Sequence, residues 1–187
     1  MEVEHRTSAA RERILDTASQ LFYERGIQTV GVDTVIAEAG VAKMTLYRHF
    51  HSKEELVAAY LARRDARWRE WFDEKVLSVD ATARERLLMI FDVLEEWFAT
   101  DNFHGCAFIN ANAEHAGVTA EPVIREHKQA MLDMLEQLAR EADLEEPGKV
   151  SRELFLLKEG AMVTARMEGG TEAASQARRA AERLIAG

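Results

Sequence analysis

Apolar side chains recur at helical spacing along almost the whole chain, and this spacing constrains the fold more than any other feature of the sequence. In the first amphipathic stretch the spacing is i, i+4, i+7 and i+8, which places on one helix face Ile14, Ala18, Leu21 and Phe22. No segment alternates apolar and polar residues strictly enough for a strand. Only two prolines and ten glycines occur in 187 residues, which leaves little material for sheets joined by tight turns. The sequence therefore predicts an all-α protein.

The same periodicity divides the chain into nine helical segments. They lie at about residues 8–25, 32–39, 42–50, 52–76, 84–100, 105–115, 121–141, 149–168 and 171–186. The second and third segments are short, and Gly40 between them allows the chain to reverse because glycine adopts positive φ at little cost. Two short helices that are joined by such a turn and supported by a longer helix form a helix-turn-helix unit.

A capping motif marks the start of the fourth segment. In Ser52-Lys53-Glu54-Glu55 the Ser52 hydroxyl is placed to accept the Glu55 backbone N–H, while the Glu55 carboxylate reaches back to the Ser52 N–H. The helix that follows continues for about six turns, far longer than the two before it. We therefore expect a helix-turn-helix domain over residues 1–52 and a larger helical domain over residues 53–187.

The third segment concentrates positive charge in an acidic chain. The formal net charge is −9 at pH 7, yet residues 40–53 contain Lys43, Arg48 and Lys53 and no acidic residue. In a helix-turn-helix unit the second short helix lies in the major groove of DNA, where its first turns meet base edges and its neighbours contact phosphates. The alternative interpretation is a solvated charged helix, in which Arg48 pairs with an acidic neighbour such as Glu54.

Helical spacing also divides the side chains of this segment between the core and DNA. Leu46 and Phe50 lie one turn apart, and we expect both to point inward. The side chains on or beside the outward face, with one more at the start of the next helix, offer donors to base edges and phosphates. The predicted contacts with double-stranded DNA are Lys43, Thr45, Tyr47, Arg48, His49 and Lys53.

The stretch VDTVIAEAGVAKMTLYRHFHSKEEL resembles the DNA-binding region of the TetR/AcrR family of bacterial transcriptional regulators. The resemblance covers about residues 14–61, and the family pattern is present as Ala39-Gly40-Val41, Thr45-Leu46-Tyr47, Phe50 and Ser52-Lys53-Glu54. It implies a three-helix DNA-binding domain joined to a helical ligand-binding and dimerisation domain. It also implies a homodimeric repressor that binds a palindromic operator and is released by a small molecule. An activator with the same DNA-binding domain is the alternative.

Two residues depart from the family pattern at helix starts. Gly31 stands where members often carry a capping serine or threonine, and Ala42 stands where serine is frequent at the start of the recognition helix. Both family side chains contact phosphate, and this chain lacks the hydroxyl groups for those two contacts. Backbone N–H groups at a helix start attract an anion without help from a side chain.

Aromatic side chains at helical spacing in the second domain indicate either an ordinary core or an effector cavity. Their number favours an apolar or aromatic effector, and a few polar groups on an otherwise apolar segment are enough to orient such a ligand. The same polar groups equally suit helix caps or solvent-facing positions. The candidate effector contacts are Trp68, Phe72, Phe91, Phe108, Asn110, Glu114 and Met131.

The last two segments are rich in small side chains, which allow helices to approach closely. A two-fold interface of four helices between two subunits would use these side chains, as the resemblance also implies. Packing inside one chain is the alternative. The candidate interface residues are Leu154, Ala161, Ala165, Ala177, Ala181 and Leu184.

Cys106 is the only cysteine, so the chain forms no internal disulfide. Together with His104, His115 and His127 it suggests a metal site, but the paired spacing of a structural zinc site is missing. No oxyanion-stabilising loop accompanies the thiol. We therefore expect no metal, no cofactor and no enzyme activity, and we keep a metal or thiol sensor that uses Cys106 as a less favoured alternative.

The sequence also bears on where the protein works. Nothing near the N-terminus joins a basic start to an apolar run, and no apolar stretch approaches the length that spans a membrane. We expect a cytoplasmic protein without a membrane partner.

Overall fold

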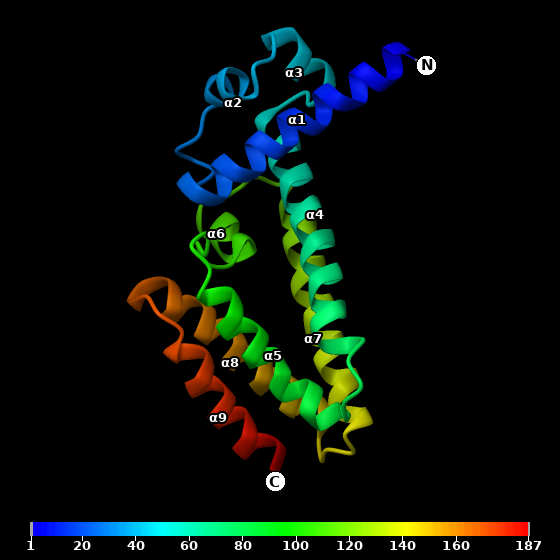
Figure 1. Ribbon diagram of the computed structural model, residues 1–187, viewed down its shortest axis with the longest axis vertical. Helices are drawn as coiled ribbons and strands as arrows, with labels where there is room; N and C mark the ends of the chain where they lie inside the picture. The colour runs from blue at the N-terminus through cyan, green and yellow to red at the C-terminus, as the bar shows by residue number, and fades with distance from the viewer. Residues whose placement is uncertain (1, 187) are drawn as a thin grey trace. The chain divides into compact units, whose positions relative to one another are not determined.

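The computed structural model describes the backbone of residues 2–186 and the side chains of residues 9–186, and this part of the chain is helical without a strand (Figure 1). The prediction of an all-α fold is confirmed. The helices are α1 (Glu2–Arg25), α2 (Val32–Ala39), α3 (Lys43–His49), α4 (Lys53–Phe72), the π-helical turn η1 (Asp73–Leu77), α5 (Ala83–Phe98), α6 (Ala107–Ala113), α7 (Glu121–Glu141), α8 (Pro147–Glu168) and α9 (Glu172–Ala186).

The helices lie close to their predicted positions, with two differences. Helix α1 begins at Glu2, several residues before the expected start. Helix α6 is shorter than the predicted segment 105–115 because backbone with positive φ flanks it, at Gly105 (φ 84°) and at His115 (φ 53°). A residue with positive φ does not continue a right-handed helix.

The contacts between residues divide the chain into two compact units. The first unit contains the residues up to Ala66 together with Ala107–Arg125, and the second contains Arg67–Cys106 together with the residues from Glu126 onward. Helix α4 begins at Lys53, next to the expected boundary, and continues past Ala66, where the first unit ends. The boundary at residues 52/53 stays a prediction.

The first unit is built around α1, which packs against α2 and α3. Ile14, Val35 and Leu46 contribute one fully buried side chain from each of these helices. Burying such a side chain is worth about 1.5–3 kcal/mol, so the three helices hold one another in a fixed arrangement.

Helix α2 ends at Ala39, and the next two residues, Gly40 and Val41, cap it. Gly40 has φ 60° and ψ 42°, and its backbone N–H donates to the Ala37 carbonyl over 3.2 Å. The Val41 N–H donates to the Ile36 carbonyl over 3.3 Å. These bonds satisfy carbonyls that the helix end leaves open, and they direct the chain into α3.

The capping motif at the start of α4 forms with one change of partner. Ser52 Oγ accepts the Glu55 backbone N–H over 3.1 Å, as the sequence predicts. The Glu55 carboxylate, however, accepts the backbone N–H of His51 (2.8 Å) rather than that of Ser52, and it also meets His51 Nδ1 at 2.9 Å. These bonds from His51 lower the pKa of the Glu55 carboxyl group.

The second unit has its core where α5, α8 and α9 meet. Helix α5 starts at a complete capping box, in which Thr82 Oγ1 accepts the Glu85 N–H (3.3 Å) and the Glu85 carboxylate accepts the Thr82 N–H (2.7 Å). Leu87, Leu94 and Leu154 are at most 1% exposed in this core. Among the described residues, every helix is too short or too polar to cross a membrane.

We predict that Gly40→Ala destabilises the protein by about 1–2 kcal/mol, because a Cβ at positive φ is strained even though open space surrounds this position. Gly148→Ala is the matched control. Gly148 lies in the first turn of α8, and an added Cβ there meets only the Glu136 carboxylate at ordinary contact distance. We expect the control to be neutral or to stabilise by up to about 1 kcal/mol. Urea unfolding measures both variants, and equal stability of Gly40→Ala and the native protein would contradict the role given to this turn.

Candidate functional site

Helix α3 has an outer face that is open and mostly polar, because Leu46 in the helix and Phe50 at its C-terminal end are buried in the core of the first unit. Leu46 and Phe50 are at most 1% exposed, as the sequence predicts. Lys43, Tyr47 and Arg48 are exposed. The structure therefore brings three of the six predicted DNA contacts to one open surface, while the other three, Thr45, His49 and Lys53, are half-buried.

The cations on this surface differ in their partners. Lys43 Nζ lies 3.2 Å from Asp33 Oδ1 on α2, and the two side chains are 63% and 85% exposed. An exposed ion pair is worth about 0–1 kcal/mol, so a phosphate replaces Asp33 at little cost. Arg48 forms no ion pair with Glu54 or with any other side chain that the structure describes. Its guanidinium group is therefore open to an anion.

His49 differs from its neighbours on α3. Its Nε2 atom is buried and has no hydrogen-bond partner among the described residues. Burial lowers the pKa of His49, and the positive charges of Arg48 and Arg11 lower it further. The ring is therefore neutral at neutral pH, and Nδ1 is the nitrogen left for a contact with phosphate.

Met44 is a residue of this surface that the sequence analysis did not identify. Its side chain is 80% exposed on α3. The sequence could have indicated this exposure, because Met44 lies two residues before the inward-pointing Leu46 and residues two apart point to different sides of a helix. In the major groove the methyl group of thymine provides an apolar partner for such a side chain.

A cavity of about 360 Å³ in the second unit gathers three of the predicted effector contacts. Trp68, Phe72 and Met131 line it together with His127 and other residues from α4, η1 and α7. The Trp68 ring stacks on Phe72 with 4.6 Å between centroids, and it meets the His127 ring edge-on at 5.6 Å. The mostly apolar lining suits an aromatic ligand.

The other four predicted effector contacts lie elsewhere in the chain. Phe91 is 1% exposed within the core of the second unit. Phe108, Asn110 and Glu114 belong to α6 and the turn after it, in the first unit. The Glu114 carboxylate accepts the Gln28 backbone N–H over 2.8 Å, and the Glu114 carbonyl accepts the Gln28 side-chain amide over 2.9 Å. Glu114 therefore holds the turn between α1 and α2.

The second unit also contains a buried charge cluster that the sequence analysis missed. Lys158 on α8 is 2% exposed and pairs with Glu159 over 3.1 Å. Glu159 also pairs with Lys128 on α7, and Lys128 Nζ lies 3.6 Å from Cys106 Sγ. The signal in the sequence was the position of Lys158 one turn after Leu154, on the buried stripe of α8.

Burial and charge act against each other in this cluster. Burial lowers the pKa of Lys158, and the Glu159 carboxylate opposes that effect only in part. Burial favours a raised pKa for Glu159, but the ammonium groups of Lys158 and Lys128 outweigh it, so the pKa of Glu159 is lowered. Glu159 is therefore ionised at neutral pH.

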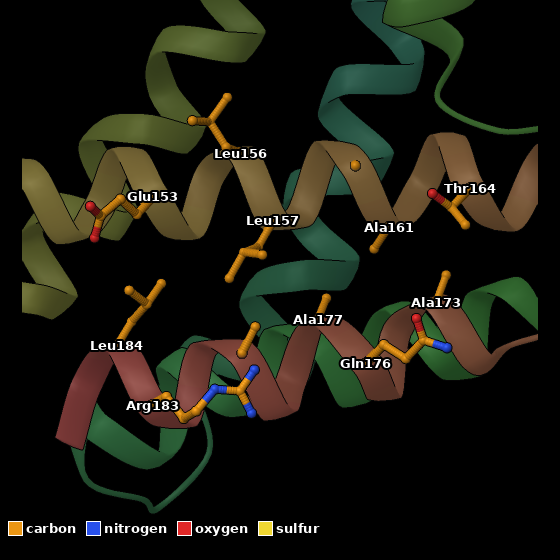
Figure 2. Close-up of a pocket in the computed structure, with 12 residues that line it drawn as sticks. Glu153, Leu156, Leu157, Ala161, Thr164, Ala173, Gln176, Ala177, Arg183 and Leu184 are labelled. Carbon is orange, nitrogen blue, oxygen red and sulfur yellow. The ribbon is translucent and has the colours of Figure 1, made fainter.

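Helices α8 and α9 border a groove of about 720 Å³ (Figure 2). In Figure 2, Leu157 and Ala161 on α8 face Ala177 and Leu184 on α9 across this groove. Three of the predicted interface residues thus line the groove. The other three are at most 3% exposed and pack inside one chain: Leu154, Ala165 and Ala181.

Helix α8 also exposes large apolar side chains outside the predicted interface set. Leu156 is 68% exposed, Val163 40% and Met167 80%. Leu156 lines the groove as well. Exposed apolar side chains that gather beside a groove are typical of a surface that another protein covers.

Cys106 is buried, with 7% of its surface exposed. Within the part of the chain whose side chains are described, no three His, Cys, Asp or Glu residues are grouped so that they could hold a metal ion.

Known proteins resemble this chain in two ways: a family model matches its DNA-binding region, and solved structures match its whole fold. Residues 14–60 match the family model for bacterial regulatory proteins of the tetR family. The crystal structure of SCO4454, a TetR-family transcriptional regulator from Streptomyces coelicolor, superposes with a TM-score of 0.87 and 31% identity, covering 96% of this chain and 95% of that one.

Two curated relatives match over shorter stretches. The uncharacterised HTH-type transcriptional regulator Rv1255c of Mycobacterium tuberculosis is 37% identical over 105 residues, which are 51% of this chain and 52% of the relative. The HTH-type transcriptional repressor NemR of Escherichia coli is 29% identical over 111 residues, 59% of this chain and 56% of the relative. The chain thus spans about half the length of these curated relatives. The reduced form of NemR has the same fold, with a TM-score of 0.86 at 23% identity over 95% of this chain and 97% of that one.

The match to SCO4454 over nearly all of both chains decides the family, and the match to the family model at residues 14–60 agrees with the resemblance seen in the sequence. Members of this family are DNA-binding regulators rather than enzymes, in accord with the expectation from the sequence. This chain belongs to the TetR family of bacterial transcriptional regulators.

Proposed function

We propose that the protein is a homodimeric repressor that binds a palindromic operator through α3 and leaves it when a small effector binds. The observation that carries the proposal is the division of α3 into two faces, with Leu46 and Phe50 buried and Lys43, Tyr47 and Arg48 exposed. A helix with this division inserts its outer face into a major groove while the core holds its rotation. The repressor NemR, matched over 59% of this chain, favours repression over activation.

The exposed side chains of α3 are assigned to different parts of the DNA. Lys43 and Arg48 donate to phosphates or to a guanine edge, and Tyr47 donates its hydroxyl to a phosphate. Thr45 and Met44 offer methyl groups to thymine. His49 and Lys53 contact phosphates beside the groove. Gly31 and Ala42 cap α2 and α3 without a side-chain hydrogen bond, which agrees with the two departures from the family pattern.

We predict that Tyr47→Ala weakens binding to the promoter region upstream of the protein's own gene by about 10- to 100-fold, because a hydrogen bond to a charged group is lost. Tyr47 is 38% exposed, so its removal leaves the core intact. Gel-shift titration at fixed ionic strength measures the affinity, and urea unfolding measures the stability.

Val118→Ala is the control for Tyr47→Ala, because it truncates a 75% exposed side chain that lies between α6 and α7 rather than on α3. We expect the control to bind DNA with native affinity. Native affinity of Tyr47→Ala itself would count against insertion of α3 into the groove.

The groove between α8 and α9 and the apolar side chains beside it are proposed as the dimer interface. Leu156 and Leu157 on α8, with Leu184 on α9, offer apolar surface that a second copy of the chain would bury. The same surface patch on both subunits makes a two-fold contact. Two α3 helices are then available for two half-sites about 34–36 Å apart.

Leu156→Glu should convert the dimer into monomers, since the interface would bury an unpaired carboxylate. The side chain is 68% exposed in one chain, so folding is unaffected. Val118→Glu places the same charge at a 75% exposed apolar position of the first unit and should leave the dimer intact. Sedimentation equilibrium distinguishes the two outcomes, and a dimeric Leu156→Glu protein would exclude this surface as the interface.

The effector is proposed to bind in the cavity that Trp68, Phe72 and Met131 line. An effector that binds best to the DNA-free conformation of the protein weakens operator binding. By linkage, operator DNA weakens effector binding by the same factor. Transcription from the upstream promoter with purified RNA polymerase tests the sign of regulation. Lower transcript levels are expected on addition of the protein, and higher levels would identify an activator.

A second candidate function is regulation through the oxidation or alkylation of Cys106. Lys128 Nζ lies 3.6 Å from Cys106 Sγ, and a neighbouring cation is one of the features found beside reactive thiols. In this case N-ethylmaleimide should release the native protein from the promoter fragment, while Cys106→Ser should stay bound after the same treatment. Gel shift reads both outcomes. DNA binding of the native protein that is insensitive to the reagent would exclude this candidate.

A further inference from the structure

Lys158 is a buried ammonium group whose charge is incompletely balanced. Its side chain is 3% exposed, and its carboxylate partner Glu159 also pairs with Lys128. Two ammonium groups therefore share one carboxylate, which leaves an excess of one positive charge when all three groups are ionised. The rings of Trp68 and Phe155 lie 5.7 and 5.9 Å from Lys158 Nζ, near the outer limit of cation–π attraction, and they compensate little of this charge.

Stability does not by itself require a charged cluster at this position. The buried neighbours of Lys158 along α8 are Leu154, Ala161 and Met162, so a methionine at position 158 would continue their apolar stripe. Replacement of a buried ion pair by apolar side chains of similar volume is often neutral or stabilising. The ammonium group is therefore better explained by what it binds than by stability, and its excess charge selects an anion.

The cavity of the second unit provides the surface for the rest of such a ligand. Trp68 belongs to both places, because it lines the cavity and its ring also neighbours Lys158. Phe72 and Met131 add apolar surface in the same cavity. A flat apolar body would match the Trp68 and Phe72 rings, and a negative charge at its edge would match Lys158, which neighbours the Trp68 ring without lining the cavity itself.

We infer that the effector is an aromatic carboxylate, whose ring lies against Trp68 and Phe72 and whose carboxylate pairs with Lys158 and Lys128. This inference rests on the proposed function, since it names the chemical class of the effector at the proposed site. A second carboxylate beside Glu159 would complete a cluster of two ammonium groups and two carboxylates. The charges in the buried cluster then balance.

Matched pairs of acids and their uncharged amides test the charge requirement. We expect benzoate or 2-naphthoate to bind the native protein at least about 30-fold more tightly than benzamide or 2-naphthamide, because the amide leaves the ammonium group unpaired. Lys158→Met should remove this preference. Glu159→Gln should strengthen it, since the variant removes the carboxylate that competes with the ligand. Isothermal titration calorimetry of the full chain without DNA measures each affinity.

Lys149→Met is the control, because Lys149 is an exposed lysine of the same helix that pairs with Glu146. It should keep the native preference. Equal binding of acid and amide, failure of both acids to bind, or an unchanged preference in Lys158→Met would overturn the inference. Calorimetry without DNA separates this result from the proposed function, which the gel shift tests. A protein that binds its promoter but shows no preference for acids keeps the proposed function and loses only the inference.

Discussion

The burial of Leu46 and Phe50 in the first unit is the constraint on which the recognition surface depends. Both side chains are at most 1% exposed, and they fix the rotation of α3 about its own axis. Because α3 has only seven residues, its own backbone hydrogen bonds contribute little stability, and the packing against α1 and α2 must hold it. The exposure of Lys43, Tyr47 and Arg48 follows from this packing. Their identity matters for DNA, but their direction is set by the apolar residues behind them.

Lys43 of the first unit and Lys158 of the second unit show how burial changes the cost of leaving an ammonium group unpaired. Lys43 pairs with Asp33 at an exposed position, so a phosphate would replace that partner at little cost. Lys158 is removed from water, and its charge is difficult to leave unpaired. An exposed lysine such as Lys43 suits DNA binding, in which many weak contacts add up and the affinity falls as the salt concentration rises. A buried lysine such as Lys158 suits a site that accepts one charge and rejects a neutral ligand of the same shape.

The sequence predicted the helices well because helical periodicity and caps are local signals. Helix α7 has the predicted bounds, whereas α6 is shorter because Gly105 and His115 have positive φ. The glycine was a signal for such a conformation, but the histidine was not. The candidate cavity was predicted only in part. Its lining comes from α4, η1 and α7, and linear spacing does not reveal which aromatic residues of distant helices meet. Lys158 could have been found, since it interrupts the buried stripe of α8.

The proposed homodimer compensates for how few contacts a seven-residue helix can make. One α3 offers a handful of exposed donors, and their phosphate contacts carry no sequence information by themselves. A second copy makes the binding of the second half-site intramolecular, so the affinity rises steeply without new kinds of contact. The dependence of affinity on two half-sites also makes DNA binding sensitive to the distance between the two α3 helices. An effector that shifts the spacing of two α3 helices forfeits the second half-site, and the remaining half-site cannot hold the operator alone. An acidic body adds to this effect, because it repels DNA wherever α3 does not engage.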